Sequence, residues 1–194
     1  MDAFIREAIS QSISVKQLIL GSTELINQLE AAARATIRSL QNGGKVLLCG
    51  NGGSAADAQH LAGEFVSRFR FNRPALPAVA MNTNASILTA IGNDYGFSIL
   101  FSRQVEALSA PGDVLWAFST TGNSENIRNA LSCAKERGVL TLAFLGGTGG
   151  GCLKYADFPL LVPSADTPRV QEAHIMMGHI LCDCIEKTMF KPQS

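Results

Sequence analysis

The chain of 194 residues is 46% hydrophobic and 16% charged, and its 16 lysines and arginines balance its 16 aspartates and glutamates. Disorder requires low hydrophobicity with a high net charge, so we expect a folded chain with a core sufficient for one domain. The densest basic stretch holds only Arg68, Arg70 and Arg73. This charge distribution argues against nucleic acid or a membrane surface as a partner.

The cysteines and the first residues indicate the compartment. The five cysteines form no CxxC pair and are odd in number, which predicts free thiols in a reducing cytoplasm. The first seven residues include acidic side chains and lack the apolar run of a signal peptide. The uncharged segments 74–93 and 138–153 are interrupted by proline, asparagine, threonine or clustered glycine, so we expect no membrane span.

Apolar periodicity alternates between two patterns along the chain. Apolar residues at helical spacing are typical of amphipathic helices, and short continuous apolar runs are typical of strands buried on both faces of a parallel sheet. In chain order, the expected elements are helices at 2–20 and 22–42, a strand at 45–49, a helix at 55–70, a strand at 77–81, two helices within 85–108 broken near Gly92, a strand at 113–118, a helix at 123–137, strands at 140–145 and 158–162, and a helix at 167–189.

This alternation predicts an α/β fold with a five-stranded parallel sheet and helices on both of its faces. We expect the flavodoxin-like strand order 2-1-3-4-5. The chain then forms a single domain over residues 1–194, with an N-terminal helical extension in 1–42 and the α/β core in 43–194. Ligands of such sheets bind beyond the carboxyl ends of the strands where the strand order reverses, which is here between the first and third strands.

The loop after the first strand, residues 50–54, is rich in glycine and opens the next helix. Glycine lets a ligand approach the backbone closely, and the N–H groups at a helix start favour an anion. An ordinary tight turn is an equally simple interpretation. The loop has no Walker lysine, and no acidic residue ends the second strand, so we expect no nucleotide cofactor.

The loop after the third strand, residues 119–124, carries four hydroxyl side chains at another helix start. Hydroxyls, free backbone N–H groups and the helix dipole together predict a site for one phosphate group without lysine or arginine. The alternative is ordinary helix capping, which needs only one of these hydroxyls.

Ionisable residues recur on two of the expected helices. Asp57, His60 and Glu64 share one stripe of the helix at 55–70, and Gln171 and His179 lie within roughly 80° of each other on the last helix. These residues are also consistent with a solvated face and a satisfied core histidine. If the two helices meet, His60, Glu64, Gln171 and His179 could form a tetrahedral N/N/O/O site that suits Zn²⁺.

Four motifs occur in order: GNGGSAADAQH at 50–60 followed by GEF at 63–65, IGNDYG at 91–96, STTGNS at 119–124, and TPRVQEAH at 167–174 with His179. From about residue 36 to the C-terminus, the chain resembles the bacterial phosphoheptose isomerases of the SIS (sugar isomerase) domain superfamily. The resemblance implies interconversion of sedoheptulose 7-phosphate and D-glycero-D-manno-heptose 7-phosphate, the first step toward the heptose of lipopolysaccharide or other surface glycans. It also implies a homotetramer with active sites at the subunit interfaces.

The resemblance assigns roles by position. The implied metal ligands are His60, Glu64, Gln171 and His179, with one Zn²⁺ per subunit, although some family members are described as working without a metal. The implied substrate contacts are Asn51, Gly52, Gly53, Ser54, Asp57, Glu64, Asn93, Asp94, Ser119, Thr120, Thr121, Ser124 and Gln171.

An aldose–ketose isomerisation needs a base on carbon, an acid/base on the oxygens and a group that stabilises the enediolate. We hypothesise that Glu64 is the carbon base, that His179 is its acid/base partner, and that Zn²⁺ when bound polarises the oxygens. A non-catalytic sugar-phosphate-binding regulator would keep the hydroxyl loop and need no such pair. An isomerase for a different phosphosugar would keep both.

Overall fold

The computed structural model describes residues 1–190 and contains a five-stranded, all-parallel sheet in the order β2-β1-β3-β4-β5. The strands are β1 (Val46–Gly50), β2 (Ala78–Ala80), β3 (Val114–Ser119), β4 (Leu140–Gly146) and β5 (Phe158–Val162). The predicted α/β class and strand order are therefore confirmed. The switch between β1 and β3, which pair from Val46↔Val114 to Gly50↔Phe118, also lies where the sequence predicts it.

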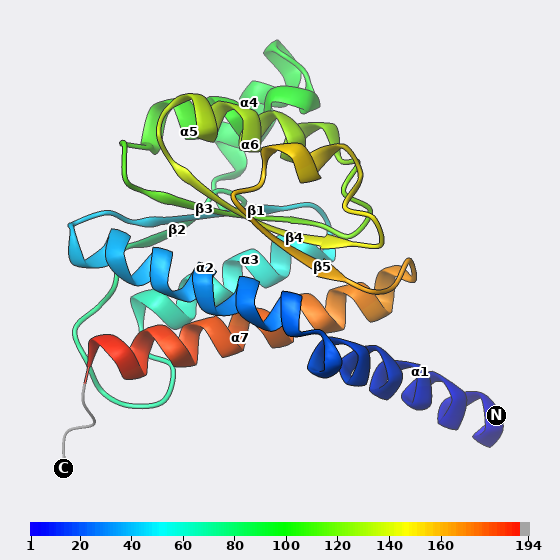
Figure 1. Ribbon diagram of the computed structural model, residues 1–194. Coiled ribbons are helices and arrows are strands. Elements are labelled where there is room, and N and C mark those ends of the chain that lie inside the picture. Colours follow the sequence, from blue (N-terminus) through cyan, green and yellow to red (C-terminus); the bar gives the residue numbers. More distant parts are fainter. Residues whose placement is uncertain (191–194) are drawn as a thin grey trace.

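Helices cover both faces of this sheet (Figure 1). One face carries α2 (Thr23–Gln41), α3 (Gly53–Val66) and α7 (Thr167–Met189), and α1 (Asp2–Gly21) projects beyond them to a free end. The other face carries α4 (Ala85–Asp94), α5 (Ser102–Leu108) and α6 (Glu125–Glu136). The short 3₁₀ helices η1 (Phe97–Ile99) and η2 (Gly150–Tyr155) pack against α6.

Alternate strand residues feed two apolar clusters, one on each face of the sheet. In β1, Val46 and Leu48 face α2, α3 and α7, whereas Leu47 and Cys49 face α5 and α6. Trp116 is fully buried on the first of these faces. Burial on both faces explains why the strands are continuously apolar instead of alternating with polar residues.

Two boundaries and one short element differ from the sequence prediction. Helix α3 ends at Val66 instead of residue 70, because Arg73 takes up its last carbonyl groups. Gly92 lies inside α4, and the break comes at Gly96, whose positive φ of 93° lets its N–H bond to the carbonyl of Ile91. Residues 150–155, for which no element was expected, form η2.

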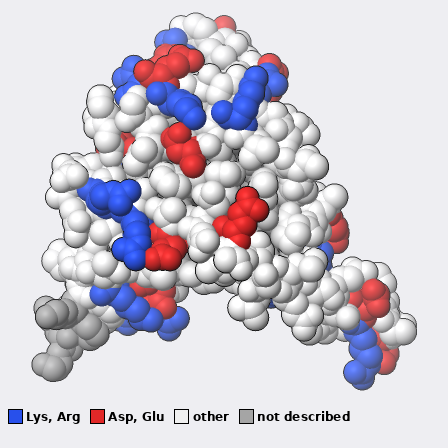
Figure 2. All heavy atoms as spheres, viewed as in Figure 1, with Lys and Arg blue, Asp and Glu red and all other residues white. Residues whose placement is uncertain are grey.

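Charges of both signs are scattered over the face seen in Figure 2, which shows no broad basic area. Arg73, which belongs to the densest basic stretch of the sequence, is buried: its side chain is 2% exposed and is paired with Glu186. The five cysteines are free. Within residues 1–190, no helix combines the length and the apolar character needed to cross a membrane.

Candidate active site

The histidine-bearing helices α3 and α7 lie side by side beneath the sheet (Figure 1). Their close approach depends on Gly178, since a Cβ there would collide with the side chain of Leu61. Leu61 and Gly178 directly adjoin His60 and His179 in sequence. The glycine contact therefore brings the two imidazoles together.

His60, Glu64 and His179 form a compact group whose ligand atoms all lie within 4.8 Å of one another. The two Nε2 atoms of His60 and His179 are 2.8 Å apart, and Nε2 of His60 is 3.3 Å from Oε1 of Glu64. His60 and Glu64 are neighbours because residues four apart share one face of a helix. Two imidazoles and a carboxylate are a donor set that suits Zn²⁺ or a similar divalent ion.

The protonation of His179 suits this arrangement. Burial lowers its pKa, and the neighbouring His60 lowers it further, while Glu64 opposes the shift. Near neutral pH, His179 is therefore an uncharged imidazole that can bind a cation or accept a proton. Without a cation, the short Nε2–Nε2 distance requires one ring to donate and the other to accept.

Gln171 lies farther along the seam between α3 and α7. Its side chain packs on Gly53, where a Cβ would overlap it. Burial raises the pKa of Asp57, and the neighbouring Gln171 and His60 oppose that shift. Eight residues separate Gln171 from His179, about 12 Å along the helix axis. Asp57 thus stands between Gln171 and the histidine group.

The hydroxyl loop follows β3 and leads into α6. The Ser119 hydroxyl donates to Oγ of Ser124 over 3.1 Å, and the Ser124 side chain makes no capping bond to α6. Thr121 does not cap α6 either, since its Oγ1 accepts the N–H of Asn123 at 3.2 Å in a local turn before the helix. The first N–H groups of α6 remain available to an anion beside two serine hydroxyls.

The two loops at the strand-order switch are joined by a pair of amides. Asn51 and Asn126 exchange two side-chain hydrogen bonds of 2.9 Å, and Asn126 is buried. The amide of Asn51, an expected substrate contact, is thus occupied by Asn126 in the isolated chain. The sequence analysis did not single out Asn126; its signal is a polar residue on the apolar face of an amphipathic helix.

Asn93 and Asp94 lie apart from the other candidate residues. Both are at the C-terminal end of α4, which covers the opposite face of the sheet from α3 and α7 (Figure 1). They are exposed and bond to each other, with Nδ2 of Asn93 donating to Oδ1 of Asp94 over 2.8 Å. A single chain therefore does not bring them to the histidine group.

Comparison with known proteins gives a consistent result. A family model described as the SIS domain matches residues 14–146. The chain is 56% identical to the phosphoheptose isomerase of Clostridium acetobutylicum over 98% of this chain and 97% of that protein. It is 51% identical to that of Aneurinibacillus thermoaerophilus over 98% and 96%.

The chain belongs to the phosphoheptose isomerase family. The solved structure of a phosphoheptose isomerase from Neisseria gonorrhoeae superposes with a TM-score of 0.90 at 43% identity, covering 96% of this chain and 98% of that one. The similarity to phosphoheptose isomerases thus extends over β1 to α7 and includes both helices of the histidine group and the hydroxyl loop.

Proposed function

We propose that this phosphoheptose isomerase interconverts sedoheptulose 7-phosphate and D-glycero-D-manno-heptose 7-phosphate through a cis-enediol. The observation that carries the proposal is the convergence of Glu64 and His179 in a chain that belongs to this family. The reaction moves a proton between C1 and C2 and a second proton between their oxygens, so it needs two acid/base groups near each other.

Glu64 removes the proton from the carbon and returns it to the neighbouring carbon. His179, uncharged because burial lowers its pKa, transfers the proton between the two oxygens. Asp57, whose pKa is raised by burial, orients a hydroxyl of the sugar together with Gln171.

The substrate phosphate binds at Ser119, Thr120, Thr121 and Ser124 and at the start of α6. The mutual bond between Ser119 and Ser124 supports this assignment, because two hydroxyls that bond only to each other can turn toward an anion. The backbone of Asn51, Gly52, Gly53 and Ser54 borders the sugar from the adjacent loop. No nucleotide takes part.

His60, Glu64 and His179 would hold a Zn²⁺ ion, and Gln171 is the proposed fourth ligand. The fit rests on three donor atoms that converge within 4.8 Å. A bound ion would polarise the oxygens on C1 and C2 and stabilise negative charge on them. Glu64 cannot serve fully as ligand and base at one moment, so its two roles alternate.

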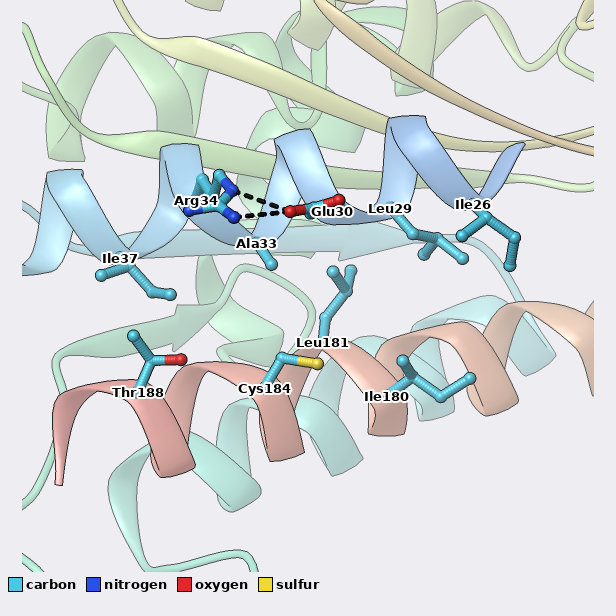
Figure 3. Close-up of a pocket in the computed structure, with 10 residues that line it drawn as sticks. All are labelled: Ile26, Leu29, Glu30, Ala33, Arg34, Ile37, Ile180, Leu181, Cys184 and Thr188. Atoms are coloured by element: carbon cyan, nitrogen blue, oxygen red, sulfur yellow. Dashed lines mark hydrogen bonds and ion pairs between the residues drawn. The ribbon is translucent and has the colours of Figure 1, made fainter. Parts of the chain in front are cut away.

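We further propose a homotetramer whose subunit interfaces complete the active sites. Asn93 and Asp94 need a second chain to approach the histidine group, and the side chain of His60 is 50% exposed in one chain. An apolar groove of about 350 Å³ between α2 and α7, lined on its two sides by Leu29 and Leu181, also needs cover (Figure 3). So do the exposed apolar residues of α1, Phe4, Ile5, Ile9 and Ile13.

The free cysteines support a cytoplasmic location, and the product would serve as the first precursor of a surface-glycan heptose. The test is to incubate the purified protein with sedoheptulose 7-phosphate, with and without a chelator, and to follow the aldose by NMR. Appearance of the heptose phosphate supports the proposal. Turnover of only another phosphosugar, or binding without turnover, would instead favour a different isomerase or a regulatory module.

A further inference from the structure

A buried ion pair that the proposed chemistry does not use lies next to the histidine group. Nε of Arg73 is 3.1 Å from Oε1 of Glu186, and their side chains are only 2% and 1% exposed. Burying two charges is costly, and an apolar pair of similar volume is often no less stable. A role in positioning would explain such a pair better than a contribution to stability.

Arg73 closes the C-terminal end of α3. Its Nη2 donates to the backbone carbonyl of Glu64 and its Nη1 to that of Phe65, both over 2.7 Å. The last four carbonyls of a helix have no partner within it, and a cationic side chain there also interacts favourably with the helix dipole. One guanidinium thus holds the main chain of the proposed base itself.

Glu186 fixes the segment that follows α3. Its Oε1 accepts the N–H of Phe69 over 2.9 Å, and its Oε2 accepts the N–H of Arg70 over 2.7 Å. The ring of Phe69 lies against the imidazole of His179, with centroids 5.6 Å apart and planes at 33°. Glu186 therefore determines which aromatic surface His179 meets.

The imidazole of His179 and the carboxylate of Glu186 lie on the same side of α7. His179 and Glu186 are seven residues apart, which places them within about 20° of each other around the axis. A rigid α7 thus carries His179 at one point, while two turns later Glu186 holds Arg73, which in turn holds the main chain of Glu64. The ion pair therefore links the helix that carries His179 to the main chain of Glu64. Neither Arg73 nor Glu186 is among the residues proposed to contact the substrate.

We propose that Arg73 and Glu186 are positioning residues that set the separation and orientation of Glu64 and His179. This inference rests on the proposed isomerase function in assigning chemical roles to Glu64 and His179. A displacement of about 1 Å in a catalytic group can lower the rate by about a hundredfold, so loosening this pair should lower kcat. Substrate affinity, which depends mainly on the hydroxyl loop, should change little.

The test compares Arg73→Lys and Glu186→Gln with Asp113→Asn. Lysine keeps the charge but cannot donate to two carbonyls and a carboxylate in one fork. Asp113 is a matched control, since it too is a buried carboxylate that accepts two backbone N–H groups, those of Lys45 and Ala110, and a cationic side chain. It lies at the amino ends of the strands, away from the histidine group.

For the folded fraction of Arg73→Lys and Glu186→Gln, we expect kcat to fall at least about tenfold while KM stays within about twofold. Asp113→Asn should keep kcat within about twofold even if its melting temperature falls. Unchanged kcat in both pair variants, or an equal loss in Asp113→Asn, would overturn the proposal. Glu186→Gln, nearly isosteric, keeps the test decisive should Arg73→Lys not fold.

A second readout needs no substrate. The chain has three histidines, so labelling their Cε1 atoms with ¹³C gives three NMR signals. The signals of His60 and His179 should move in the pair variants, while that of His174, buried near Phe118 and Phe144, should stay. Unmoved signals would refute the positioning role. If the wild-type protein does not isomerise the heptose phosphate, the proposed function fails, whereas this comparison still decides whether the pair positions His179.

Discussion

The buried His174 should make the protein lose stability in mild acid. Its side chain lies within α7 against Phe118 and Phe144 at the carboxyl ends of β3 and β4, with ring centroids 6.2 and 5.9 Å away. Burial lowers its pKa from 6.5 to about 4, and the nearby backbone of Leu145 only partly opposes this shift. The imidazole is therefore neutral in the folded protein throughout the physiological range.

The sign of the effect follows from proton linkage. Below pH 6.5 the unfolded chain binds a proton at His174, whereas the folded chain binds one only near pH 4, so acid favours unfolding. The stability that His174 contributes is complete above its unfolded pKa and is lost as the pH falls toward 4. Between pH 7 and 4.5 the expected loss is about 2 kcal/mol, from roughly 1.4 kcal/mol per unit of pKa difference.

The assay is denaturant unfolding of wild type and His174→Phe at a series of pH values and one fixed protein concentration. Phenylalanine keeps an aromatic ring in the site and removes the titration. His60, His179 and all carboxylates are present in both proteins, so their contributions cancel in the difference. The wild-type free energy of unfolding should fall by about 2 kcal/mol more than that of the variant between pH 7 and 4.5. Parallel pH profiles would refute the assignment of a neutral buried His174.

Three further predictions concern the active site. Glu64→Gln should lower turnover by roughly 10²–10⁴-fold while the chain stays folded. Glu136→Gln, which changes another helical carboxylate that is bonded one turn back to Ser132, should keep full activity. Turnover of Glu64→Gln above about one per cent of wild type would contradict the base assignment. Replacing both Ser119 and Ser124 by alanine should weaken sugar-phosphate binding by at least about tenfold in calorimetry, since each hydrogen bond to a charged group is worth about 1.5–3 kcal/mol; unchanged affinity would place the phosphate elsewhere. The purified protein should carry about one Zn²⁺ per chain, and chelation should lower its melting temperature and activity because the ion binds only the folded state. His179→Ala should lose the metal, whereas His174→Phe should keep it. Full activity in metal-free protein would point to a metal-free mechanism.

The sheet could be predicted because its strands are buried on both faces and so appear as continuous apolar runs. Each of the five expected strands is present, and the short helix-bearing connections leave few alternatives to the observed order. The predicted end of the helix after β1 was wrong because side chains distant in the sequence determine where that helix ends. The helix after β1 looks continuous to residue 70, but Arg73 and Glu186 take the backbone groups that would extend it.

The candidate site was predictable to the extent that it depends on spacing within one helix. The interval of four residues places His60 and Glu64 on one face, whereas the approach of His179 depends on helix packing that spacing alone does not define. Glycine 178, which permits that approach, gave no signal in the sequence because a glycine within a helix has many possible causes. The resemblance to a family, and not the periodicity, supplied the pairing of the two helices.

The burial of Arg73 has a physical reason that also concerns the mechanism. Charged side chains are usually solvated, and nothing in the sequence pattern distinguishes Arg73 from Arg68 and Arg70. Only Arg73 of the three is buried in an ion pair, and it is the one whose guanidinium reaches the carbonyl of Glu64. The hydrogen bonds of a buried guanidinium are directional, so they can hold the main chain at the end of α3 at a fixed distance from α7. An apolar side chain cannot do this. Arg73, which the sequence pattern alone does not mark out, is therefore the residue that connects α7 to the proposed base.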